Sequence, residues 1–317
     1  MKTRFLLLTA LLSSLAAGLL HAEELTIGFQ KASLNLILLK SKGTLEKRLG
    51  PQGITVKWID FPAGPQLLEA LNVGSVDFAM TGDTPPIFAQ AAGTSLVYIG
   101  NEPPKPKVSA ILVAKDSPLK SLTDLKGKKV AFQKGSSANY LVIQALESSG
   151  LSLNDIQPVY LAPAEARAVF ETGSVDAWAV WEPFYSATEK ALAARALTNG
   201  VGLSSNPTFY LASKKFSESQ PKVIAVIFDE LSKNDDFLQK DRKGAAKILG
   251  DYVGISPVIF ENVLERLPSV KVNYLDAETI ASQQRIADTF FRLGIIPKAV
   301  KVSDIVWHPE TKKISAK

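Results

Sequence analysis

The sequence predicts a two-lobed α/β protein in which each lobe is a mostly parallel sheet flanked by helices, with two hinge crossings. Strand-like and helix-like segments alternate along the first two thirds of the chain. A proline-rich stretch, NEPPKPK at 101–107, interrupts this alternation, which then starts again. The tetrapeptide GSVD occurs at 74–77 and again at 173–176, once in each half of the pattern. These observations indicate two similar units.

The first unit is expected to contain four strands and three helices. The strands are predicted from apolar or alternating runs at 25–30, 54–61, 76–82 and 95–100. The helices are predicted from apolar periodicity at 33–50, 64–74 and 84–93. Thr84 is expected to cap the last of these helices, with Pro85 at its first position. The alternating order favours a parallel sheet with ligand-binding loops at the carboxyl ends of its strands.

The second unit repeats this order after the prolines. Strands are predicted at 109–115, 128–133, 156–161 and 175–181, with helices at 134–150 and 163–173. In both units the glycine of GSVD ends a helix and the valine begins a strand. Six residues beyond the aspartate of each GSVD comes an acid near a proline and a helix start, Asp83 in the first unit and Glu182 in the second. The repeat is therefore expected to be structural.

The last third of the chain is predicted to return to the first lobe. A strand at 208–215 is followed by four helical segments at 217–241, 242–254, 257–267 and 276–293. We expect residues 23–104 and 210–317 to form lobe 1 and residues 105–209 to form lobe 2. Two lobes joined in this way imply a cleft that closes around a small ligand.

Residues 1–22 have the pattern of a secretory signal peptide. Lys2 and Arg4 precede an apolar run at 5–20, and the small residue Ala22 precedes the first acids. We expect cleavage near Ala22 and export of a soluble protein. Its removal lowers the formal charge from +5 to +3, and no basic run with interleaved aromatic residues remains. Nucleic acid is therefore not an expected partner.

Residue usage argues against catalysis and against a metal or cofactor. The 317 residues contain no cysteine, which excludes a thiol nucleophile, a thiolate metal site and a lipid-carrying N-terminal cysteine. The two histidines, His21 and His308, leave the body of the mature chain without the usual base of hydrolytic triads. An exported hydrolase using Ser136 or Ser137 is a rival interpretation, but no G-x-S-x-G motif surrounds either serine.

The loops at the predicted strand ends favour an anion. A helix begins at each of four loops, which contain Gln30, TGDTPP at 81–86, QKGSSAN at 133–139 and WEPFY at 181–185. Backbone N–H groups and the positive ends of helix dipoles can therefore point at a bound group. Glycines allow close approach of a ligand and hydroxyls add donors, so an oxyanion such as a sulfonate can be held without an arginine. KGSS lacks the spacing of a phosphate loop, which argues against a nucleotide.

Several of these residues have an alternative structural role. The hydroxyls of Thr84, Ser136 and Ser137 can cap helices, and Asp83 can complement a helix dipole. Trp178 and Trp181 lie on opposite faces of a regular strand, so we expect only Trp181 to face the cleft. Glu182 can contact a ligand cation or belong to a hinge network, and the sequence does not separate these roles.

Four stretches carry a family resemblance: FPAGPQLLEALNVGSVDFAMTGDTPPIFAQAAG, NEPPKPK, DLKGKKVAFQKGSS and GSVDAWAVWEPFYSA. They resemble the aliphatic sulfonate-binding proteins of bacterial ABC importers. The resemblance implies a periplasmic-binding-protein fold (type II) and a monomeric periplasmic protein that delivers an aliphatic sulfonate to a membrane permease. It implies ligand contacts at Gln30, Gly82, Asp83, Thr84, Ser136, Ser137, Trp181 and Glu182. Taurine, nitrate or an aromatic sulfonate remains an alternative ligand, and an amine would give Asp83 or Glu182 a cation to pair with.

Overall fold

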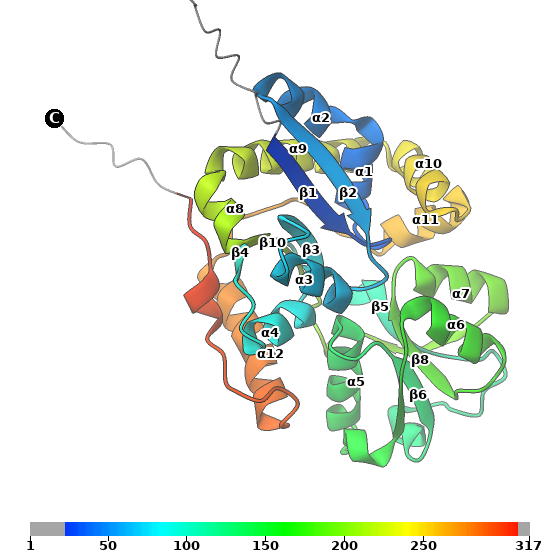
Figure 1. Cartoon of the computed structure of the whole chain (residues 1–317). Helices are drawn as coiled ribbons and strands as arrows, with labels where there is room; N and C mark the ends of the chain where they lie inside the picture. Colours follow the sequence, from blue (N-terminus) through cyan, green and yellow to red (C-terminus); the bar gives the residue numbers. More distant parts are fainter. Residues whose placement is uncertain (1–22, 310–317) are drawn as a thin grey trace, which may run out of the picture.

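The computed structural model describes residues 23–309 and contains two five-stranded sheets flanked by helices (Figure 1). The sheet nearer the N-terminus is covered by helices from both ends of the chain, and the green middle third forms the other lobe. The expected signal peptide and its cleavage site lie outside the described residues. Within 23–309, no helix has both the length and the apolar content to cross a bilayer.

The sheet of lobe 1 has the order β2-β1-β3-β10-β4. Strand β1 (Glu23–Phe29) pairs in parallel with β2 (Ile54–Asp60) and β3 (Phe78–Gly82). Strand β10 (Thr208–Ser213) lies antiparallel between β3 and β4 (Leu96–Glu102). The sheet is therefore mostly parallel, with one antiparallel strand that comes from beyond lobe 2.

The sheet of lobe 2 has the order β7-β6-β8-β5-β9, which repeats that topology. Strand β6 (Lys129–Phe132) is parallel to β7 (Gln157–Tyr160) and β8 (Ala177–Trp181). Strand β5 (Ser109–Val113) lies antiparallel between β8 and β9 (Arg195–Asn199). In each sheet the antiparallel strand is the first after a crossing from the other lobe. The predicted fold class is confirmed.

Helices fill the connections between the parallel strands. They are α1 (Leu34–Lys42), α2 (Thr44–Leu49), α3 (Gly64–Asn72) and α4 (Thr84–Ala91) in lobe 1, and α5 (Ser137–Ser148), α6 (Pro163–Glu171) and α7 (Phe184–Leu192) in lobe 2. The single helix predicted at 33–50 is wrong, because Gly43 adopts a left-handed conformation (φ 60°) that ends α1. Short 3₁₀ turns occupy Gly50–Gln52, Pro106–Val108, Leu122–Leu125, Leu153–Asp155 and Val302–Ile305.

Five helices follow β10: α8 (Lys214–Ser219), α9 (Pro221–Lys240), α10 (Arg242–Val253), α11 (Pro257–Glu265) and α12 (Ala277–Arg292). The helix predicted at 217–241 is wrong at its start. Pro221 has no N–H to continue the preceding helix, so α8 ends and α9 begins there. Ile227, Leu249 and Phe260 pack in one core with residues of β1 and α1, so α9, α10 and α11 cover the sheet of lobe 1.

The two glycines of GSVD end their helices in the same way. Gly74 and Gly173 have φ of 76° and 69°, the left-handed region that favours glycine. After α3, Gly74 N donates to Leu71 O at 3.1 Å and Ser75 N donates to Ala70 O at 2.9 Å. The second copy repeats both bonds after α6. The pattern is a Schellman motif, and it confirms the predicted role of glycine. The strands begin at Phe78 and Ala177, two residues later than the predicted valines.

The aspartates of GSVD also make matching contacts. The Asp77 carboxylate accepts a hydrogen bond from Thr26 N at 2.9 Å, and Asp77 N donates to Thr26 O at 2.9 Å. Asp176 forms the same reciprocal pair with Lys129, at 2.8 and 2.9 Å. Each copy therefore ties a helix-to-strand corner to the neighbouring parallel strand, at the end of the sheet away from the strands' carboxyl ends.

The two crossings between the lobes run side by side. Lys105 N donates to Ser205 O at 2.9 Å, and Asn206 Nδ2 donates to Ser109 Oγ at 3.3 Å. Strand β10 already begins at Thr208, two residues before the expected start of the second segment of lobe 1. We infer that the hinge comprises residues 103–108 and 200–207.

Candidate functional site

A cavity lies between the two lobes at the carboxyl ends of their strands. Lobe 1 contributes Gln30, Ala32, Ser33, Leu34, Gly64, Met80, Thr81, Gly82 and Pro85, and lobe 2 contributes Ser136, Ser137, Trp181 and Glu182. The hinge contributes Lys105, Val108 and Asn206, and the adjoining ends of β4 and β10 contribute Glu102 and Thr208. The segment after α11 adds Leu267 and Val270. A ligand held here would touch both lobes and both crossings.

Six of the eight site residues expected from the sequence line this cavity. They are Gln30, Gly82, Ser136, Ser137, Trp181 and Glu182. Each lies at the carboxyl end of a parallel strand or at the start of the helix that follows, as the alternating pattern required. The geometry therefore brings together residues that are up to about 150 positions apart in sequence.

Asp83 and Thr84 are not among the lining residues, and both side chains are fully buried. Thr84 Oγ1 donates to Asp83 Oδ1 at 3.0 Å, and Asp83 O accepts from Gln283 Nε2 at 2.5 Å. Burial raises the pKa of the Asp83 carboxyl, against hydrogen bonds from Ser137 and Thr84. Helix α4 begins at Thr84, so Asp83 occupies the cap position that was predicted for Thr84. Both side chains are therefore buried behind the residues that line the cavity.

Ser136 combines the two roles that the sequence left open. Its hydroxyl oxygen accepts from Asn139 N at 3.4 Å and thereby caps α5, and its hydroxyl donates to Gln133 O at 2.7 Å. Ser136 also lines the cavity, but its hydroxyl hydrogen is already used. Ser137 lines the cavity as well, and its hydroxyl also hydrogen-bonds to the Asp83 carboxyl of lobe 1.

Gly82 of lobe 1 and Ser137 of lobe 2 are in close contact at the cavity. A Cβ atom built on Gly82 would lie 2.1 Å from Ser137 Oγ and 3.3 Å from Ser137 Cβ. Only glycine allows the end of β3 and the start of α5 to approach so closely. An anion in the cavity beside this contact would meet backbone from one lobe and a hydroxyl from the other.

Helix N-termini converge on the cavity. Residues in the first turns of α1, α4 and α5 line it, namely Leu34, Pro85 and Ser137. The first N–H groups of a helix have no intrahelical partner, and this end of the helix dipole attracts negative charge. The arrangement supports binding of an anion by neutral donors. Among residues 23–309, no group of histidine and acidic side chains could hold a metal ion.

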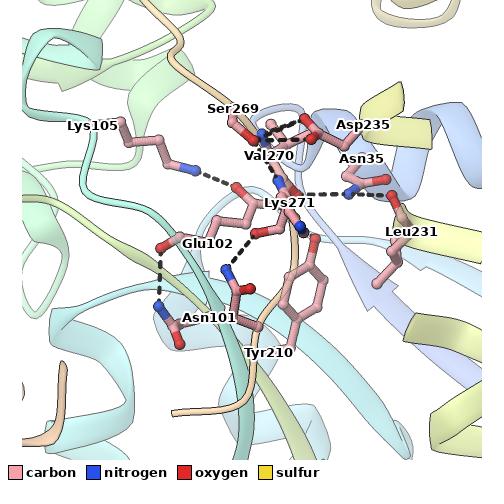
Figure 2. Close-up of polar contacts among 11 residues, drawn as sticks. Asn35, Asn101, Glu102, Lys105, Tyr210, Leu231, Asp235, Ser269, Val270 and Lys271 are labelled. Carbon is pink, nitrogen blue, oxygen red and sulfur yellow. Dashed lines mark hydrogen bonds and ion pairs between the residues drawn. The ribbon is translucent and has the colours of Figure 1, made fainter. Parts of the chain in front are cut away.

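The hinge side of the cavity carries a buried charge pair (Figure 2). Lys105 Nζ bonds to Glu102 Oε2, and the Tyr210 hydroxyl donates to Glu102 Oε1 at 2.6 Å. Burial, followed by the Glu102 charge, raises the pKa of Tyr210 well above its ordinary value, so the phenol remains a donor. Lys105 is the only cationic side chain among the described residues lining the cavity, and Glu102 neutralises it. The polar residues of NEPPKPK were the sequence signal for this wall.

The third wall is apolar and comes from the segment between α11 and α12. The Asp235 carboxylate accepts from Val270 N at 2.9 Å and from Ser269 Oγ at 3.0 Å, and Asn35 Nδ2 donates to Val270 O at 3.1 Å (Figure 2). These bonds fix Val270 beside the cavity, which Leu267 also lines. No local sequence pattern indicated this wall, because the segment has no periodicity of its own.

Glu182 is engaged by its own lobe and by lobe 1. Its carboxylate accepts from Ser186 N at 3.0 Å, from Ser186 Oγ at 2.8 Å and from Arg266 Nη1 at 2.6 Å. Burial raises the pKa of the Glu182 carboxyl, while Ser186 and Arg266 oppose the shift. Of the two roles considered from the sequence, the geometry supports the network that joins the lobes.

The two tryptophans of β8 lie on opposite faces of the sheet, as predicted. Trp178 is 1% exposed and packs against Phe170 with ring centroids 5.9 Å apart. Trp181 packs on the core of the other face and lines the cavity. Its large apolar ring therefore lies where the substituent of a ligand could contact it.

Comparison with known proteins identifies close relatives. The family model NMT1/THI5 like matches residues 50–239. A putative aliphatic sulfonates-binding protein from Escherichia coli (strain K12) is 46% identical over 90% of this chain and 89% of its own length. The alkanesulfonate-binding protein SsuA from Xanthomonas axonopodis pv. citri, bound to MOPS, is 45% identical, with a TM-score of 0.85 over 90% of this chain and 98% of that chain. The periplasmic aliphatic sulphonate binding protein SsuA from Escherichia coli is also 45% identical, with a TM-score of 0.83 over 90% and 92% of the two chains.

Proposed function

Because this chain belongs to the aliphatic sulfonate-binding proteins of the NMT1/THI5-like family, we propose that it captures aliphatic sulfonates and delivers them to the permease of an ABC importer. One observation carries the proposal. The cavity between the lobes has neutral donors at converging helix starts, an apolar wall, and carboxylates that are already paired. Such a cavity suits an anionic head on an alkyl chain. The relatives are binding proteins, so this chain acts by binding and not by catalysis.

The sulfonate head is assigned to the end of the cavity formed by Gly82 and Ser137. A sulfonate is permanently ionised and weakly basic, so several modest donors hold it without a proton transfer. The start of α5 offers free N–H groups, and Gln30 lines the same cavity from lobe 1. Binding by neutral donors also allows release to a permease, since no charge pair has to be broken.

The alkyl chain is assigned to the apolar part of the lining, which comprises Leu34, Met80, Val108, Trp181, Leu267 and Val270. Burial of each methylene contributes about 0.8 kcal/mol, so affinity should rise with chain length until the wall is filled. Nitrate has no group to occupy this surface. The apolar lining therefore favours an alkanesulfonate over nitrate.

The paired carboxylates disfavour the amine-bearing alternative. Glu102 and Glu182 are the only acidic residues among the described ones that line the cavity, and each accepts from a cation of the protein. The ammonium group of taurine would have to compete with Lys105 or Arg266 for these partners. Taurine would also lose its hydration on entering an apolar cavity. We therefore favour unsubstituted alkanesulfonates over taurine.

The mature protein is proposed to be periplasmic, like the Escherichia coli relative, with cleavage after Ala22 and function as a monomer. These assignments rest on the N-terminal pattern and the family. Mass spectrometry of the exported protein and sedimentation of the purified chain would check them.

A thermal-shift screen tests the proposed ligand class. Methane- to octanesulfonate, taurine, sulfate and nitrate are added to the mature protein at equal concentrations. A ligand that binds only the folded state raises the melting temperature, and at equal concentration the tighter ligand gives the larger shift. We expect the largest shifts from alkanesulfonates of intermediate length. If taurine or nitrate gave the largest shift, the assignment to aliphatic sulfonates would be wrong.

A further inference from the structure

Arg266 reaches from lobe 1 into lobe 2. The residue caps the C-terminus of α11, whose Phe260, Val263 and Leu264 belong to the core of lobe 1. Its guanidinium nevertheless donates to Glu182 at 2.6 Å and to Glu189 at 2.5 Å, both in lobe 2. The contact therefore joins the two lobes across the cavity side of α7.

The guanidinium is held firmly on α7. Besides the two carboxylates, Nη1 lies 3.1 Å from Ser186 Oγ, and the guanidinium carbon is 3.9 Å from the centroid of the Tyr185 ring. The Arg266 side chain is 24% exposed, so solvent screens these contacts only in part. A planar guanidinium that stacks and makes several directed bonds cannot be replaced by a lysine at the same site.

Glu182 makes this contact relevant to the ligand. Its carboxylate lines the cavity, and its side chain is only 6% exposed. A negative charge in the wall of a poorly hydrated cavity repels an anion more strongly than it would in water. Arg266 is not among the lining residues, so it cancels this charge without contacting the bound anion.

From these contacts we propose that Arg266 is a specificity-determining residue that acts through Glu182: closure brings its guanidinium onto the carboxylate, which adapts the cavity to an anion and withholds Glu182 from ammonium groups. The inference rests on the proposed function and deepens it. Without Arg266, the wall would repel an alkanesulfonate and would offer a carboxylate to an ammonium-bearing sulfonate such as taurine.

The test measures the affinities of butanesulfonate and taurine by isothermal titration calorimetry in the wild-type protein and in Arg266→Gln, Glu182→Gln and the double variant. Glutamine keeps part of the side-chain volume and removes the charge. The matched control is Arg292→Gln, which removes another ion pair between the lobes, Arg292 to Glu147 at 2.8 Å, between α12 and α5. That pair lies outside the cavity lining.

We expect Arg266→Gln to weaken butanesulfonate binding about tenfold, which corresponds to about 1.4 kcal/mol. Taurine binding should weaken less, so the preference for butanesulfonate over taurine becomes smaller. Adding Glu182→Gln to Arg266→Gln should restore at least about threefold of the butanesulfonate affinity, because the uncompensated charge is then gone. Arg292→Gln should change both affinities by less than about twofold. Equal losses for both ligands with no recovery in the double variant would overturn the proposal.

Two further results separate this inference from the proposed function. If the wild-type protein binds butanesulfonate and Arg266→Gln binds it equally well, only the role of Arg266 is wrong. If the wild-type protein binds neither ligand, the proposed function fails, and melting temperatures without ligand still test the charge argument. Arg266→Gln should melt below the wild type, and the double variant should regain part of the loss. A double variant that melts below Arg266→Gln would contradict the argument.

Discussion

Gly82→Ala tests whether the close approach of the two lobes forms the ligand site. The new methyl group would lie 2.1 Å from Ser137 Oγ and 3.3 Å from Ser137 Cβ. The hydroxyl can rotate away, but the Cβ cannot move without a shift of the backbone. The substitution should therefore hinder closure of the lobes and displace the hydroxyl that is assigned to the sulfonate.

The magnitude follows from the cost of overpacking, about 1–3 kcal/mol when a methyl group is forced into a filled space. Because rotation of the hydroxyl relieves part of the overlap, we expect a loss toward the lower end, about tenfold in affinity for butanesulfonate. The backbone of Gly82 itself has no positive φ, so alanine adds no backbone strain. Gly82→Ala should therefore lower the melting temperature of the unliganded protein less than it lowers the melting temperature of the liganded protein.

Isothermal titration calorimetry of the variant provides the assay, with Gly50→Ala as the matched control. A Cβ on Gly50 would meet nothing within 4 Å, and the φ of Gly50, −52°, is helical, so the Gly50→Ala variant should bind butanesulfonate like the wild type. Adding Ser137→Ala to Gly82→Ala removes the nearest atom, so the double variant should lose less than the sum of the single losses. If Gly82→Ala bound butanesulfonate as tightly as the wild type, the assignment of the head group to this contact would be refuted.

Three other substitutions follow from the site. Ser137→Ala removes a donor to a charged group and should weaken butanesulfonate binding about tenfold by calorimetry, and an unchanged affinity would contradict its role. Leu267→Ala enlarges the cavity at its apolar wall and should shift the preference to an alkanesulfonate with a longer chain. The free energy of unfolding should fall by about 2–5 kcal/mol in denaturant melts. An unchanged chain-length preference would exclude this wall as the site of the alkyl chain. Asp83 has a raised pKa in the folded protein because of burial, so the free energy of unfolding should fall as pH rises above about 4, the value of an unfolded carboxyl. Asp83→Asn removes this fall. The melting temperature of the variant, relative to that of the wild type, should therefore rise as the pH rises. Parallel pH profiles would show that Asp83 is not the source.

The parts of the site that lie at strand ends could be predicted from the sequence. Alternating strands and helices place residues such as Gln30, Gly82 and Ser137 at one edge of their sheets, and the type of residue indicates an anion. Asp83 and Thr84 do not line the cavity, because α4 begins one residue beyond Asp83 and both side chains are buried inside the protein. A helix boundary that differs by one residue decides whether such a side chain reaches the cavity, and helix propensity does not fix the boundary that closely.

The remaining walls depend on contacts between distant parts of the chain. Lys105 and Asn206 were visible as polar residues at the two predicted crossings, but their partners were not. Arg266 and Leu267 lie at the end of the helix predicted at 257–267, and Val270 follows it in a segment without periodicity. The position of these residues depends on Asp235 and on the packing of α11, which the sequence does not reveal. The resemblance to a family supplied the ligand class, while the paired state of Glu182 could only be learned from the structure.

Calorimetric titration of the mature chain with butanesulfonate, with and without a large excess of taurine or sulfate, tests the central claim most directly. We predict one butanesulfonate per chain, bound at least about tenfold more tightly than taurine, with no competition from sulfate. Binding of taurine in preference to butanesulfonate, or the absence of any butanesulfonate binding, would contradict a cavity built for an anionic head and an alkyl chain.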